Sequence, residues 1–153
     1  MKGGVYIMFS IYTLLLYIHI LSAVLSIGPL FVVLTIVKKM RTASSGEMPP
    51  YIESFKGAID IVKHSGHVLV GSGILLMWHA GYHWSTSWIV LTFLVMFASI
   101  IFLARAFKPT LRTFNTQAYN QQQFVALLQR KAWMYILLLL IMLWLMVAKP
   151  IIW

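Results

Sequence analysis

The chain has 153 residues, of which 61% are hydrophobic and only 10% are charged, and its mean hydropathy is +0.86. Soluble domains carry roughly a quarter charged residues, so this composition excludes an ordinary soluble domain and indicates a protein embedded in lipid. The net charge of +9 is confined to short stretches between apolar runs, which is typical of membrane topology signals and argues against nucleic acid as a partner.

The first predicted transmembrane span covers residues 5–37. No charged residue occurs from Gly3 to Val37, and this run is much longer than the ~20 residues that a helix needs to cross a bilayer. Such a helix must tilt, bend or protrude, and Gly28-Pro29 provides a place for a bend because proline lacks an N–H. The run is also too long for the core of a signal peptide, which predicts a retained span.

The second uncharged run, His64 to Ala104, is long enough for two helices. Its middle, 81–88, is polar, aromatic and small. This pattern predicts spans at 61–83 and 86–107, joined by a tight turn at the membrane interface.

The fourth predicted span, 131–149, is leucine-rich and just long enough to cross. Between the spans we expect cytoplasmic segments at 38–60 and 108–130. Within the first of these segments, Tyr51 to Lys63 carries an apolar stripe typical of an amphipathic helix. That helix is either interfacial or an extension of the second span.

Basic residues predict the orientation. Ten of the twelve Lys and Arg residues lie in the stretches Lys38 to Lys63 and Arg105 to Lys131. The positive-inside rule therefore places both termini and the turn near Trp84 outside. The predicted fold is all-α: one integral membrane four-helix bundle over residues 1–153, multi-pass in a cell membrane of the bacterial plasma-membrane type, with both termini extracytoplasmic.

Five histidines are the candidate cofactor-binding residues, because ionisable groups within a membrane are costly and usually functional. The first span contains His19, and the second carries His64, His67, His79 and His83. At about 100° per residue the four in the second span share one side of the helix. Counted outward from the basic ends, His19, His79 and His83 should lie at similar depth in the outer half.

Three interpretations of these histidines remain open. His19 and His79 on neighbouring helices are typical of the axial ligands of haem b. A set of His19, His79 and His83 would instead hold copper in a metal transport accessory. In the third interpretation the histidines only pack, and the protein is a non-catalytic partner or assembly subunit in a homo-oligomer or larger membrane complex.

Enzymatic motifs are missing from the sequence. It has no cysteine, Gly-rich phosphate loop, nucleophile elbow or paired-carboxylate constellation. Their absence argues against hydrolase and kinase chemistry, and we predict no catalytic residue.

Three segments resemble a group of small four-span membrane proteins: Tyr17 to Gly28 with its single histidine, the Gly-Ser-Gly at 71–73, and 105–108. The group comprises an uncharacterised family of predicted integral membrane proteins and, more distantly, the copper-resistance D proteins and the HemJ-type protoporphyrinogen oxidases. The likeness covers about residues 20–108.

The resemblance implies a helix bundle in which His19 matches the first-span histidine. In HemJ-type enzymes that histidine ligates haem b together with a lysine early in the third span. Here Ile89, Val90, Leu91 and Thr92 follow Trp88, and no lysine is present. The missing lysine argues against oxidase activity, whereas haem held by His19 and a histidine of the second span stays open.

Overall fold

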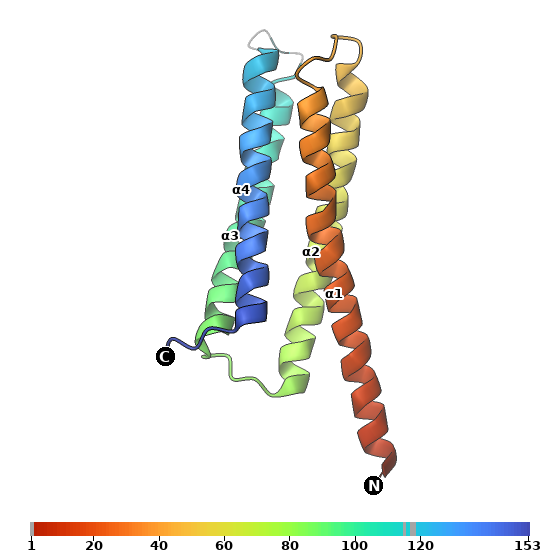
Figure 1. Ribbon diagram of the computed structural model, residues 1–153, viewed down its shortest axis with the longest axis vertical. Helices are drawn as coiled ribbons and strands as arrows, with labels where there is room; N and C mark the ends of the chain where they lie inside the picture. The colour runs from red at the N-terminus through yellow and green to blue at the C-terminus, as the bar shows by residue number, and fades with distance from the viewer. Residues whose placement is uncertain (1, 115, 117–118) are drawn as a thin grey trace.

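The computed structural model describes residues 2–114, 116 and 119–153. Within these residues its elements are four helices and no strand, which confirms the all-α prediction. The four helices are α1 (Lys2–Lys39), α2 (Met48–Ala80), α3 (Ser87–Arg112) and α4 (Gln121–Ala148). They run alternately up and down (Figure 1). Both chain termini and the α2–α3 turn lie at one end, called the terminal end, and the other two connections lie at the opposite loop end.

Three of the helices are long and apolar enough to cross a membrane, namely α1 from Ile11, α3 and α4. They indicate a multi-pass membrane protein and agree with three of the four predicted spans. Helix α2 has 33 residues, yet it does not belong to this set because His, Gly and Ser residues interrupt its apolar run. It packs antiparallel along α1 (Figure 1).

Helix α2 begins well before the predicted span. Pro49 and Pro50 stand in its first turn, where the backbone N–H groups have no partner within the helix and proline is therefore accepted. The amphipathic segment from Tyr51 to Lys63 is thus an extension of the second helix and not a separate interfacial helix. Its far end is closed by Gly81, which adopts a left-handed conformation with φ 68°.

The other predicted boundaries shift in a similar way. Helix α4 begins at Gln121, where the Asn120 side chain accepts a hydrogen bond from the Gln123 N–H. Much of the predicted segments 38–60 and 108–130 is therefore helical, although positions 115, 117 and 118 lie outside the described residues. Helix α1 continues unbroken through Pro29.

The bundle consists of two helical hairpins, α1–α2 and α3–α4. Their backbones approach each other mainly through α1 and α4, and α2 contacts α3 through the rings of Phe55 and Phe107, whose centroids are 5.5 Å apart. The largest fully buried side chains concentrate in the half next to the loop end, with Ser87 and Ile89 as exceptions. In that half they are Leu30, Val33, Val37, Met40, Met48, Phe55, Val62, Val125, Leu128 and Ile136.

Polar contacts fasten both ends of the bundle. At the loop end, the Gln121 side chain donates to the carbonyls of Met40 and Ala43, 2.9 Å each, and so joins the two hairpins. At the terminal end, the tail after α4 lies across the α2–α3 turn. There the Ile152 N–H donates to the Ser87 hydroxyl at 2.9 Å. This bond lies within the α3–α4 hairpin, and Lys149 Nζ donates to the Tyr82 hydroxyl in the α2–α3 turn. The two hairpins are joined at the loop end by Gln121 and by the ring contact of Phe55 with Phe107.

Candidate functional site

His19 is seated against α2. Its Nδ1 lies 3.1 Å from the Leu69 carbonyl oxygen and 3.0 Å from the Ser72 hydroxyl. A carbonyl oxygen only accepts hydrogen bonds, so the bond to Leu69 requires the proton on Nδ1 and leaves Nε2 with its lone pair. A Cβ atom at Gly73 would lie 3.1 Å from His19 Cε1. The small residue therefore permits the close approach of the ring.

His79 lies at a different level of the same interface. Its ring stacks on Tyr12, with centroids 6.1 Å apart. His79 follows Ser72 by two helical turns, or about 10 Å along the axis. The structure therefore brings His19 and His79 onto the same α1–α2 hairpin but not to the same depth. His83 lies exposed in the turn after α2.

The described residues contain no group of three or more His, Asp or Glu side chains that could hold a metal ion. Two further histidines of α2, His64 and His67, lie nearer the loop end than His79 does. His64 Nδ1 lies 2.7 Å from the Asp60 carbonyl oxygen, and the rings of His64 and His67 are 6.4 Å apart. Of these two, only His67 lines a cavity.

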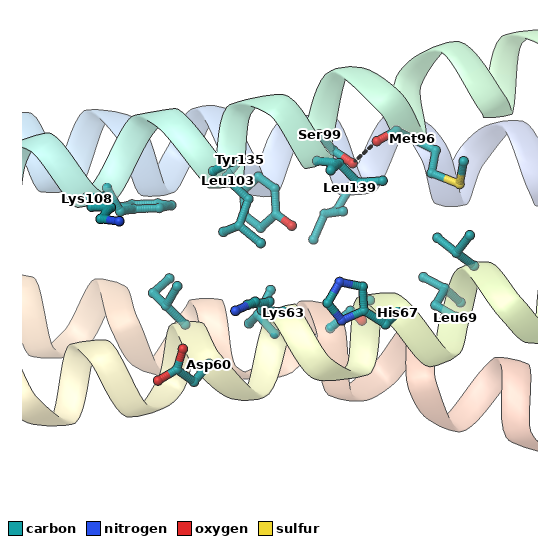
Figure 2. Close-up of a pocket in the computed structure, with 18 of the residues that line it drawn as sticks. Asp60, Lys63, His67, Leu69, Met96, Ser99, Leu103, Lys108, Tyr135 and Leu139 are labelled. Carbon is teal, nitrogen blue, oxygen red and sulfur yellow. Dashed lines mark hydrogen bonds between the residues drawn. The ribbon is translucent and has the colours of Figure 1, made fainter.

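That cavity, here called the α2–α3 cleft, occupies about 730 Å³ between the two hairpins. Its walls come from 56–70 of α2 and 96–112 of α3. Side chains of both hairpins face each other across it in Figure 2. Figure 2 also shows His67 directed into the gap toward Leu139 and Ser99 on the opposite side. The volume is in the range of small-molecule sites.

The cleft has a charged part and an apolar part. Its loop-end part carries four basic side chains and one acidic one: Lys56, Lys63, Lys108, Arg112 and Asp60. Toward the middle of the bundle its lining is mostly apolar, with three buried polar residues on the floor. These are Ser26, Ser99 and Tyr135.

Two of the three buried polar residues of the floor have partners within their own helices, whereas the Tyr135 hydroxyl makes no hydrogen bond with a described residue. The Ser26 hydroxyl donates to the Ser22 carbonyl oxygen and the Ser99 hydroxyl to that of Met96, at 2.8 and 2.7 Å. Serine in a helix is commonly satisfied in this way. The floor is therefore mostly apolar, with the Tyr135 hydroxyl as a further polar group, and the charged recognition resides in the basic part.

The four basic side chains of the cleft make no hydrogen bond or ion pair with any described residue. Elsewhere the chain does provide partners for cations. Lys131 donates to the Ala106 carbonyl oxygen and the Thr110 hydroxyl, and Lys149 to the Tyr82 hydroxyl. The cleft thus combines cations without protein partners with an apolar floor.

Sequence reasoning missed this cleft. A signal existed, because Lys56 and Lys63 are two turns apart on α2, and Lys108 and Arg112 are four residues apart on α3. Each pair therefore shares a helix face. We interpreted these charges only as topology signals. That the two faces oppose each other depends on which helices pack together, which the sequence pattern does not state.

The chain matches no protein-family model, and comparisons with curated proteins and with solved structures give no match.

Proposed function

We propose that this membrane protein binds an acidic amphiphile in the α2–α3 cleft. The observation that carries the proposal is the cleft itself, in which unpartnered cations adjoin an apolar floor. An amphiphile with an anionic head would neutralise the cations and cover the floor. Lys56, Lys63, Lys108 and Arg112 are exposed, so an anionic head can reach them while its chain covers the neighbouring floor.

The dimensions of the cleft suit such a ligand. From Lys56 to Val70 the α2 wall extends about 21 Å at 1.5 Å per residue. Half of the hydrocarbon core of a bilayer measures about 15 Å. A molecule of the length of a membrane lipid would therefore place its head among the basic residues and its chain along the floor.

We also propose that α2 crosses the membrane beside α1, with the loop end in the cytoplasm. Two observations support this topology: α2 packs antiparallel along an apolar helix, and ten of the twelve Lys and Arg residues lie in the two stretches toward the loop end. In this orientation the basic part of the cleft lies at the inner leaflet, where anionic lipids attract basic segments.

The topology can be tested with single cysteines, because the chain contains none. In intact cells, an impermeant maleimide should label Ser85→Cys in the α2–α3 turn. It should label Ser45→Cys, in the loop between α1 and α2, only after permeabilisation. Labelling of both positions from one side would show that α2 does not cross. Labelling in the reverse order would overturn the orientation alone.

Binding can be tested in lipid nanodiscs with a fluorescent fatty acid and its neutral methyl ester. We expect the acid to bind and the ester not to compete. Ser99→Phe should abolish binding by filling the floor, because Ser99 is buried in the cleft. Ala98→Phe is the matched control, since Ala98 is exposed and does not line the cleft. Equal binding by both variants, or no binding by the wild type, would refute the proposal.

Haem b is a second candidate ligand, favoured by one observation: the imidazole of His67 is directed into the cleft (Figure 2). Haem is itself an acidic amphiphile, and the residues present fit it in kind. His67 would supply an axial nitrogen, Met96 or Tyr135 lies among the other lining residues, and the basic part would hold the propionates. The bound group would supply redox chemistry.

Visible spectra separate the haem hypotheses. Protein purified from haem-supplied cells should show a Soret band that His67→Ala removes and His64→Ala preserves. The pair predicted from sequence, His19 and His79, is favoured instead if the band depends on His19. A colourless protein rejects both haem hypotheses, and copper found by metal analysis would then support the set of His19, His79 and His83.

A further inference from the structure

We infer that the α2–α3 cleft selects a phosphate monoester or diphosphate head borne on an apolar chain. This inference rests on the proposed function and specifies the ligand class of the same site. Its basis is the charge balance of the basic part, where four cationic side chains accompany a single carboxylate, Asp60. An excess of three positive charges exceeds what one monovalent head can neutralise.

The arrangement of the cations also favours phosphate. Lys56 and Lys63 belong to the α2 wall, whereas Lys108 and Arg112 belong to the α3 wall. A head held between them must accept hydrogen bonds from two opposite directions. A phosphate monoester offers three terminal oxygens and a charge of about −1.5 to −2 at neutral pH. A carboxylate offers two oxygens and one charge.

Arg112 adds a preference of its own. A guanidinium donates through a planar fork that matches two phosphate oxygens, whereas the lysines act as compact point charges. In the cleft one such fork stands on α3, and no described residue occupies it. Phosphodiester lipids with a net charge of −1 should therefore bind less tightly than a monoester lipid, although their chains contact the same floor.

The head and the floor must act together for the ligand to be a lipid. The floor belongs to the same cavity as the cations and includes Leu69, Met96, Leu139 and Met142. Removal of apolar chain from water is a large favourable contribution to binding. A free phosphate compound would gain only the head contacts and would bind far more weakly.

The experiment measures binding of four probes to the whole protein in phosphatidylcholine nanodiscs at neutral pH. They are dioleoyl phosphatidic acid, dioleoyl phosphatidylglycerol, oleate and water-soluble glycerol 3-phosphate. We expect phosphatidic acid to bind at least about tenfold more tightly than the other two lipids, which corresponds to ~1.4 kcal/mol. Glycerol 3-phosphate should not compete at equal concentration.

A charge-matched pair of double variants completes the test. Lys63→Gln with Lys108→Gln removes one cation from each wall and should reduce phosphatidic acid affinity to that of phosphatidylglycerol. Arg105→Gln with Arg130→Gln removes the same charge at exposed positions outside the cleft and should leave the preference unchanged. Equal loss in both double variants would indicate unspecific attraction to a basic surface and would overturn the inference.

The remaining outcomes separate this inference from the proposed function. If oleate or phosphatidylglycerol binds as tightly as phosphatidic acid, the cleft takes acidic amphiphiles without selecting phosphate. If glycerol 3-phosphate binds as tightly as phosphatidic acid, the site recognises a free phosphate, and the amphiphile proposal fails too. If no lipid probe binds, both proposals are refuted.

Discussion

The ring of His19 lies in direct contact with α2, between a carbonyl, a hydroxyl and a glycine. Two hydrogen bonds hold its Nδ1 side, and Gly73 leaves just enough space for Cε1. In a bilayer, small residues allow helix backbones to approach, and polar side chains link them. His19 therefore fixes the position of α1 along α2.

Gly73→Ala should weaken the α1–α2 contact. The new Cβ would lie 3.1 Å from His19 Cε1, and the hydrogen bonds of the ring oppose its displacement. Gly71→Ala is the matched control, because its Cβ would meet nothing within 4 Å and gains the same helix propensity. We expect Gly73→Ala to be less stable than the control by about 1–3 kcal/mol. Equal unfolding free energies of the two variants in detergent would contradict the contact.

Glu47 makes the α1–α2 loop sensitive to acid. Its carboxylate accepts hydrogen bonds from the Ser44 N–H and hydroxyl, 2.9 Å each, and these bonds hold the pKa of Glu47 below its ordinary value of 4.5. A lowered pKa means that the stabilisation is complete above pH 4.5 and is lost as the pH falls through the folded-state value.

The Ser44 amide reports on this loop. In hydrogen exchange, its protection factor should fall below pH 4.5 in the wild type and should already be low at pH 7 in Glu47→Ala. Protection that persists in the alanine variant at pH 7 would show that the carboxylate does not order the loop.

Among the elements, α4 has the clearest start signal. The Asn120 side chain accepts a hydrogen bond from the Gln123 N–H at 3.1 Å and so satisfies one of the free donors of the first turn. Asn120→Ala should lower the unfolding free energy by ~1 kcal/mol, whereas Asn120→Asp should preserve it. Chemical denaturation in mixed micelles measures both. Gln122→Ala, one position into the helix and exposed, serves as control and should have little effect.

The existence and type of every element were predictable, whereas several ends were not. Uncharged runs and their interruption near Trp84 predict four helices because helix length in lipid follows bilayer thickness. The start of α2 was left open, because the segment from Tyr51 to Lys63 fits either an interfacial helix or an extension of the second span, and two prolines precede it. In fact proline is accepted in a first turn, and Met48 is buried in the core of the bundle. Tertiary packing thus decides where such a helix begins.

At the scale of the whole molecule, the core is unevenly distributed along the bundle. Leu128 near the loop end is 0% exposed, whereas Leu140 on the same helix is 42% exposed. Leu128→Ala should cost about 2–5 kcal/mol through a cavity in the buried core, and Leu140→Ala less than about 1 kcal/mol. Steric trapping in bicelles measures the two changes. Comparable losses would mean that the half next to the terminal end packs as closely as the half next to the loop end.

Single residues of the candidate site were predictable from the sequence, but their arrangement was not. Polar residues on α2 were recognised from their periodicity, and His67 was among them. The α2–α3 cleft was not predicted, because periodicity describes one helix at a time. Whether Lys63 faces lipid, water or Lys108 depends on how the two hairpins pack, which is set by the contact of α1 with α4 and by that of Phe55 with Phe107.

The terminal end of α1 extends beyond the ends of the other three helices (Figure 1). With 38 residues it measures about 57 Å, against a hydrocarbon core of about 30 Å. Helix α4 has 28 residues and measures about 42 Å. Both helices are longer than the hydrocarbon core, and the excess is accommodated by tilting, by bending or by protrusion into water. Helix α2 packs along α1, so a tilt of α1 would also tilt α2. A change in bilayer thickness would therefore change the angle between the α1–α2 and α3–α4 hairpins.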